Sequence, residues 1–351
     1  MPSQFMASRT CARALRAGVL VFSVLGLSAA AQTGVEAPAS VATDEVKTTE
    51  RSASEWLLRM HEASRQRNYM GTFVVQAGAH LSSARIWHAC DGVQQMERVE
   101  SLSGTPRSTF RRNDEVTTFL PASRVAILEK RESLGLFPHV LQAANSSIDK
   151  LYRAQTSGHE RVAGLEADVV RLRPQDNLRF GYRIWSERKT GLVVKLQTLD
   201  TDGRVLEQAA FSELQLDAPV SMANLNYLMG KTEGYRVEKP GLVKTTSAEE
   251  GWALKKEVPG FKSINCFKRA RAGASVSAQD ATFQWVFSDG LASVSLFVDT
   301  YDVNRHATPG HRAMGATHTL TQRMGNWWLT AVGEVPLLTL SAFALTLERK
   351  D

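Results

Sequence analysis

The feature that most constrains this fold is a series of short segments, from residue 69 to residue 216, in which apolar and polar side chains alternate. Alternation with a period of two is typical of β-strands that bury one face. Turn-forming residues such as Asp91-Gly92 and Asp202-Gly203 separate the segments, so neighbouring strands are expected to pair as hairpins. This pattern predicts a large, strongly curved antiparallel sheet. The expected strands lie at 69–76, 83–90, 93–102, 107–112, 115–120, about 161–172, 179–187, 192–199 and 205–216.

Two helical segments accompany these strands. The sequence from Ser52 to Glu55 fits a capping box and predicts a helix that ends near Arg67 and covers the sheet. Residues 138–153 are predicted to be helical and irregular. The residues that share the apolar face of the first helix are Ala53, Trp56, Leu57, Met60 and Ala63.

A second unit follows a break in the pattern. Residues 218–249 mix Pro, Gly, Thr and balanced charge, which predicts a linker with a short helix at 221–229. Residues 250–351 are expected to form a small α+β domain of five strands and a last helix, which starts at Pro336 and ends at Glu348–Lys350. Within this domain Asp289-Gly290 predicts a type I′ turn between two strands, with the Asp289 carboxylate used by the turn.

The first 51 residues lie outside the expected fold. Residues 1–31 have three arginines, a short apolar stretch and small residues before Ala31, which is typical of a secretory signal peptide. Residues 32–51 are small and polar and are predicted to be a disordered leader. The formal charge of the whole chain is +6, and the signal carries three arginines and no acid, so removing the signal lowers the charge by three, to +3. This modest positive excess argues against a nucleic-acid partner. In an oxidising compartment Cys90 and Cys266 form either a disulfide or two separate buried thiols.

A search for catalytic and metal-binding motifs finds no complete one. His61-Glu62 begins a zinc-protease motif, but Arg65 stands where the second histidine is required. The loop histidines His306, His311 and His318 are interpreted as free side chains, so no metal site and no cofactor are predicted. The basic segment Arg107–Arg112 is interpreted as a solvated strand edge, with a site for anionic head groups as the alternative.

Several segments resemble the RseB/MucB family of periplasmic sigma-E regulators. In the first unit the similar segments are 96–121 and 161–214, and their order and spacing make the resemblance specific. In the second unit they are VPGF (258–261), FSDGLASVSLFVD (287–299), MGATH (314–318) and VGEVP (332–336).

The resemblance implies a mainly β fold of two parts. The first, at 52–217, is a half-barrel similar to lipoprotein carriers of the LolA/LolB type, and the second is the small domain at 250–351. It implies a non-enzymatic periplasmic protein that binds the periplasmic domain of a membrane anti-sigma factor, shields it from regulated proteolysis, and releases it on sensing a lipid-like or misassembled envelope component. The alternative is a periplasmic lipid or lipoprotein carrier. The apolar last helix departs from the family and leaves a homodimer open.

Two sets of site residues are predicted. Apolar side chains on strands with only one covering helix are expected to line a concavity for a lipid or lipopolysaccharide-like ligand. In the second domain, alternation lets only one tryptophan of Trp327-Trp328 face the core, so the other is expected to be exposed and to contact the partner, or else to cover the edge of the last helix. The predicted lipid-binding residues are Phe73, Val75, Trp87, Phe110 and Phe119, and the predicted partner-binding residues are Trp327, Trp328, Arg323, Lys268 and Arg269.

Overall fold

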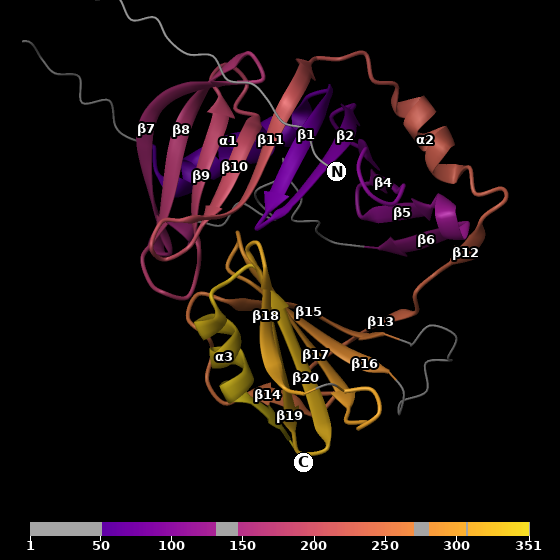
Figure 1. Ribbon diagram of the computed structural model, residues 1–351, viewed down its shortest axis with the longest axis vertical. Helices are drawn as coiled ribbons and strands as arrows, with labels where there is room; N and C mark the ends of the chain where they lie inside the picture. The colour runs from indigo at the N-terminus through magenta and orange to yellow at the C-terminus, as the bar shows by residue number, and fades with distance from the viewer. Residues whose placement is uncertain (1–50, 131–146, 270–280, 307, 351) are drawn as a thin grey trace, which may run out of the picture. The chain divides into compact units, whose positions relative to one another are not determined.

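The computed structural model describes residues 51–130, 147–269, 281–306 and 308–350 of the 351-residue chain. Strands dominate these residues, and three α-helices and two short 3-10 helices accompany them (Figure 1). The mainly β fold predicted from the sequence is therefore confirmed. The helices are α1 (Ala53–Gln66), α2 (Met222–Gly230) and α3 (Leu337–Thr346), and the 3-10 helices are η1 (Pro121–Ser123) and η2 (Ile148–Lys150).

Twelve of the described strands form one open sheet, in the order β12-β6-β5-β4-β3-β2-β1-β11-β10-β9-β8-β7. Neighbours are antiparallel except β12, which runs parallel to β6. The sheet curls, so that β7 comes close to β11 across three intervening strands. The strands are β1 (Tyr69–Ala77), β2 (His80–Cys90), β3 (Gln95–Ser101), β4 (Ser108–Arg112), β5 (Glu115–Leu120), β6 (Val125–Lys130), β7 (Tyr152–Val162), β8 (Leu165–Pro174), β9 (Gly181–Glu187), β10 (Val193–Leu199), β11 (Val205–Leu216) and β12 (Arg236–Glu238).

Helix α1 begins and ends as the sequence predicts. The Ser52 hydroxyl accepts a hydrogen bond from the Glu55 N–H at 3.2 Å, and the Glu55 carboxylate accepts one from the Ser52 N–H at 2.8 Å. The capping box therefore satisfies two N–H groups at the start of the helix. All five residues predicted for its apolar face are buried. Most of that face packs on β7–β10, against residues such as Leu172 and Ile184.

Seven further strands form a second sheet, in the order β13-β15-β16-β17-β20-β19-β18, and β14 pairs with β21 in a small separate ladder. Phe343 and Leu340 of α3 are fully buried against the core face of this sheet. Among the described helices none is long and apolar enough to cross a bilayer. The strands are β13 (Leu242–Thr245), β14 (Trp252–Leu254), β15 (Lys262–Arg269), β16 (Thr282–Ser288), β17 (Ser293–Thr300), β18 (Gly310–Met314), β19 (Thr317–Met324), β20 (Trp327–Gly333) and β21 (Leu347–Arg349).

Some predicted elements differ from the structure. The single strand expected at 161–172 is the end of β7 and most of β8, because Ala163 and Gly164 both have positive φ and make a turn there. Of the helical segment expected at 138–153, residues up to 146 lie outside the described residues, and the described part contains η2 and the start of β7. The charged residues after Thr346 form β21 instead of ending α3. Cys90 and Cys266 are both free thiols.

The expected linker contains regular structure. Its short helix, predicted at 221–229, is α2, which packs on β3 and β4 through residues such as Leu225. Beyond α2, β12 adds an edge strand to the first sheet and β13 adds one to the second. With three and four residues, these strands are too short to show a clear apolar period, so the sequence pattern could not predict them.

Candidate functional site

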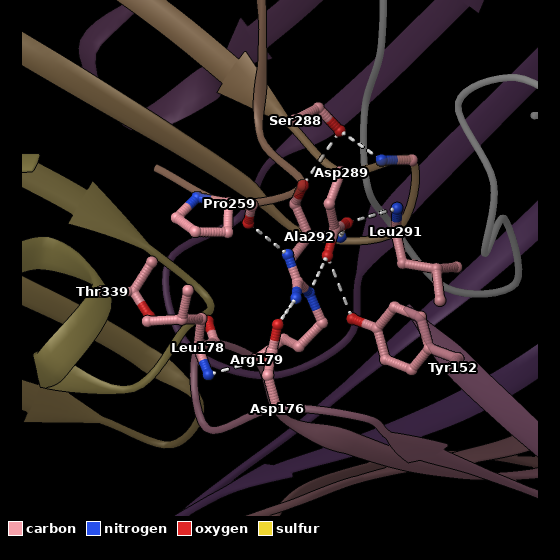
Figure 2. Close-up of polar contacts among 11 residues, drawn as sticks. Tyr152, Asp176, Leu178, Arg179, Pro259, Ser288, Asp289, Leu291, Ala292 and Thr339 are labelled. Atoms are coloured by element: carbon pink, nitrogen blue, oxygen red, sulfur yellow. Dashed lines mark hydrogen bonds and ion pairs between the residues drawn. The ribbon is translucent and has the colours of Figure 1, made fainter. Parts of the chain in front are cut away.

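The contact between the two sheets is organised around Arg179, which lies in the turn between β8 and β9. Its side chain is fully buried. The Nε atom donates to Asp289 Oδ2 at 2.8 Å, Nη2 donates to the Pro259 carbonyl at 2.9 Å, and Nη1 donates to Asp176 (Figure 2). Asp289 and Pro259 belong to the second domain, so one guanidinium binds residues from both domains.

Asp289 is the partner of this arginine at the tip of the β16–β17 hairpin. Its Oδ1 atom accepts hydrogen bonds from the backbone N–H groups of Leu291 (2.9 Å) and Ala292 (2.8 Å), which closes the hairpin loop. Its Oδ2 atom faces the first domain, where it accepts from Arg179 and from the Tyr152 hydroxyl at 3.2 Å (Figure 2). The same carboxylate therefore shapes the turn and joins the domains.

The turn itself differs from the prediction. A type I′ turn needs positive φ at both central residues. Here Gly290 has a φ of +105° while Asp289 is absent from the residues with positive φ, and the last cross-strand pair, Ser288 with Ser293, leaves a four-residue loop. The Asp289 carboxylate stabilises this wider loop through its two backbone hydrogen bonds.

The cluster of Arg179, Asp289 and Tyr152 is important for stability because it is buried. Arg179 and Asp289 are both completely buried, and an uncompensated buried charge is costly. The hydrogen bonds from Arg179, from Tyr152 and from the hairpin backbone compensate much of that cost. Burial also raises the pKa of the Tyr152 phenol well above its usual value, so the hydroxyl keeps its proton and donates a hydrogen bond to Asp289. Next to the cluster, the Thr339 hydroxyl of the last helix donates to the Leu178 carbonyl at 2.6 Å.

The strand register separates the five predicted lipid-binding residues onto two faces of the first sheet. Trp87 lies opposite Met70 on β1, three residues from Phe73, so Trp87 and Phe73 point to opposite faces. Phe73 packs with Phe211 in one buried cluster, where Val75 is partly buried. Phe110 and Phe119 pack edge to face under α2 in another cluster, which Trp87 joins. The prediction that these five residues line one concavity is therefore wrong, because the parity of the second hairpin strand was misjudged.

A cleft of about 870 Å³ lies on the α2 side of β4–β6 instead. Met229 of α2, Leu128 of β6 and Phe267 of β15 contribute apolar surface to it. Lys130, Lys239, Lys244 and Arg112 also line it, and so do the carboxylates of Asp114, Glu115 and Glu129. The cleft thus combines apolar walls with charges of both signs, although none of the five predicted residues lines it.

Three of the predicted partner-binding residues share the outer face of the second sheet. Arg269 is opposite Thr282, and Arg323 is opposite Trp328, which pairs in turn with Asp299. Lys268 is opposite Phe283 on the core face and forms an ion pair with Glu250 at 2.9 Å. Trp327 also lies on the core side, where its ring packs edge to face on Trp252. The predicted cations therefore do not form one patch.

Neither tryptophan is exposed as the sequence predicted. Trp328 does point outward, but it is only 5% exposed, because His306 stacks on its indole ring with a centroid distance of 5.0 Å. Tyr301 lies beside the same indole, and the Arg323 guanidinium lies 4.0 Å from the Tyr301 ring centroid. These loop aromatics after β17 cover the outward tryptophan, which strand alternation alone could not reveal. The same contact uses His306, whereas His311 and His318, also expected in a loop, lie on β18 and β19 with their rings in edge-to-face contact.

Sequence reasoning missed Arg179 and Tyr152 as functional residues. Arg179 stands between the apolar residues Leu178 and Phe180, shortly after the polar run 175–177, and a charge flanked by two apolar side chains is the only signal that could have identified it. Tyr152 fell inside a segment interpreted as helical.

Two protein-family models match this chain. The MucB/RseB N-terminal domain model matches residues 52–229, and the MucB/RseB C-terminal domain model matches residues 246–348. The chain is a two-domain, mainly β protein, and it belongs to the MucB/RseB family.

Its relatives include named regulators. It is 29% identical over 310 residues to the sigma factor AlgU regulatory protein MucB of Pseudomonas aeruginosa, covering 84% of this chain and 90% of MucB. It is 25% identical over 296 residues to the sigma-E factor regulatory protein RseB of Haemophilus influenzae, covering 83% of this chain and 89% of RseB. The crystal structure of MucB in complex with MucA(peri) is similar with a TM-score of 0.64 and 26% identity, over 85% of this chain and 99% of that one.

Proposed function

We propose that this protein is a periplasmic regulator of a sigma factor of the sigma-E type, which binds the periplasmic domain of a membrane anti-sigma factor and shields it from proteolysis. The observation that carries the proposal is the match of both domains, in order and over most of the chain, to a family in which MucB is found in complex with MucA(peri). The expected signal peptide supports a periplasmic location. The role is one of binding rather than catalysis.

For the partner surface we favour the outer face of the second sheet. Besides Arg269 and Arg323 it carries Phe297, which is partly exposed and lies opposite Gln284 and Thr330. An aromatic side chain on the same sheet face as two guanidinium groups suits an acidic segment with apolar residues, because charge complementarity speeds encounter while the aromatic contact supplies affinity.

Calorimetric titration of the signal-free protein with the purified periplasmic domain of its anti-sigma factor tests the proposal. We expect a one-to-one complex that protects the partner from the protease that begins signalling. The change Phe297→Ala should weaken binding at least fivefold without lowering the melting temperature much, since Phe297 lies outside the core cluster. The control Arg236→Gln, on an edge strand of the first sheet, should bind normally. Failure of the unaltered protein to bind would refute the function, whereas normal binding by Phe297→Ala would refute only this surface.

The cleft beside α2 supports the further proposal that a lipid-like ligand regulates release. Its volume of about 870 Å³ is in the range of small-molecule sites, and its walls combine apolar surface with four cations and three carboxylates, which suits an amphiphile with a polar head. A fluorescent fatty acid should bind the unaltered protein, and Met229→Trp, which fills the cleft, should reduce that binding. Tyr227→Trp is the matched control, because Tyr227 is on the same helix but is 65% exposed. Equal binding by both variants would place the ligand elsewhere.

A further inference from the structure

A second charged surface lies on the first sheet, on the side facing away from α1. Arg153 of β7 lies directly opposite Arg173 of β8, and Arg171 of β8 lies directly opposite Arg183 of β9. Residues opposite one another share a face, as do residues two apart on a strand, so all four arginines project to one side. Lys195 of β10 lies opposite Trp185, two residues from Arg183, and extends the row across four consecutive strands (Figure 1). We call these five cations the basic strand face.

The opposite side of the same strands is the one that α1 covers. Leu172 and Ile184, which alternate with the arginines, pack under the helix. The basic strand face is therefore the outward side of β7–β10. Arg153 and Arg173 are exposed, while Arg171, Arg183 and Lys195 are partly exposed.

Like charges directly opposite each other destabilise a sheet, so this arrangement has a cost. Burial and the charges of Arg173 and Arg183 lower the pKa of Arg171. Among the residues that the structure describes, no ion pair is found for any of the five cations; Arg183 donates only to the Gln197 amide, at 3.4 Å, and Lys195 lies 4.2 Å from the Trp185 ring centroid.

The carboxylates near the basic strand face form ion pairs with other arginines. Asp200 and Asp202 line a hollow of about 300 Å³ together with Arg171 and Arg173. Both carboxylates pair with Arg204, at 2.9 and 2.6 Å. Asp176, which also lines the hollow, pairs with Arg179. Asp200 and Asp202 share one arginine, so one negative charge remains in the hollow, but the five cations of the basic strand face outnumber it and form no ion pair within the described part of the chain. By contrast, Arg112, from the basic strand noted in the sequence, pairs with Glu115 at 2.5 Å.

We propose that the basic strand face docks this protein on the phosphate head groups of an anionic lipid bilayer. Four strands spaced about 4.8 Å apart spread the cations over roughly 14 Å, which is wider than one phosphate and matches several head groups side by side. Guanidinium groups form paired hydrogen bonds with phosphate oxygens, which favours arginine over lysine at such a surface. Trp185 on the same face is buried, but Arg153 and Arg173 are exposed, so lipid head groups can reach them. No step of the docking depends on binding of an anti-sigma factor.

Vesicle co-sedimentation tests this docking. The signal-free protein should bind vesicles that mix phosphatidylglycerol with phosphatidylcholine, should leave vesicles of phosphatidylcholine alone in solution, and should dissociate at high salt. The double change Arg171→Gln/Arg173→Gln should weaken binding by about 30-fold, at about fivefold per cation. Its melting temperature should stay the same or rise, because the substitutions relieve repulsion.

The control is Arg188→Gln/Arg236→Gln, which removes the same net charge from paired arginines elsewhere on the first sheet. It should keep most of the vesicle binding. Equal loss in both double variants would show a general charge effect and overturn the proposal. So would tight binding of free inorganic phosphate or of an acidic peptide to the arginines without any binding of anionic vesicles.

Discussion

Replacing Arg179 by methionine measures how much the buried contact between Arg179 and Asp289, here called the joint between the domains, contributes to the free energy of unfolding. Methionine keeps an unbranched apolar stem of similar length but removes every hydrogen bond of the guanidinium. Asp289 would then remain completely buried with only the Tyr152 hydroxyl and its own hairpin N–H groups as partners. The Pro259 carbonyl would also lose its donor.

The size of the effect follows from this burial. Removing one partner of a buried ion pair typically destabilises a protein by about 3–5 kcal/mol, because the other charge stays uncompensated. The matched surface change is Arg204→Met. The Arg204 side chain is 75% exposed and pairs with Asp200, so its removal should cost far less stability than Arg179→Met.

Urea unfolding followed by tryptophan fluorescence measures both changes. At a slope of about 3 kcal/mol per M, Arg179→Met should lower the midpoint by about 1–2 M. Asp289→Asn keeps an oxygen for the hairpin turn while removing the charge, so the double variant Arg179→Met/Asp289→Asn should cost about 1–3 kcal/mol less than the sum of the single changes. If Arg179→Met shifts the midpoint no more than Arg204→Met does, or if the two single costs simply add, the joint does not depend on this ion pair.

Three further predictions concern pH, thiols and the link. Burial, together with the charge of Glu207, raises the pKa of Glu334 to about 7; the folded state therefore holds a proton that the unfolded chain releases near its ordinary value, and stability falls as pH rises from about 4.5 to 7. Since solvent still reaches this side chain, we expect a modest effect on stability. Glu334→Gln should raise the melting temperature at pH 8 relative to the parent and should change it little at pH 4. Equal shifts of the melting temperature at both pH values would contradict this prediction. Burial raises the pKa of Cys266 to about 11, so a thiol reagent at pH 8 should leave it unmodified in the folded signal-free protein. After unfolding without reductant the reagent should detect two thiols, and detection of none would reveal a disulfide. Trace trypsin should cut first within 218–249, at the exposed Lys231 after α2, and a first cut inside 160–217 would show that the proposed domain boundary is misplaced.

The sequence predicted those parts of the fold that short-range patterns determine. The capping box at Ser52 and the apolar face of α1 depend on residues close together in the sequence. The same is true of most strands in which apolar and polar residues alternate over many positions. Strand parity was predicted less well, since Trp87 and Phe73 sit on opposite faces although both belong to alternating runs. The covered Trp328 and the buried Arg179 depend on contacts between segments over 20 and over 100 residues apart, and nothing in a local pattern specifies those contacts.

The short connection between the two sheets limits how far the domains can separate. Glu238 is the last residue of β12 in the first sheet, and Leu242 is the first residue of β13 in the second. Four residues of fully extended chain, each spanning at most about 3.6 Å, allow these two edges to move only about 14 Å apart while both strands stay paired. Even with the Arg179–Asp289 contact broken, the hairpin tip would stay at a high effective concentration near Arg179. The two domains would therefore move about this short connection and would not diffuse independently of each other.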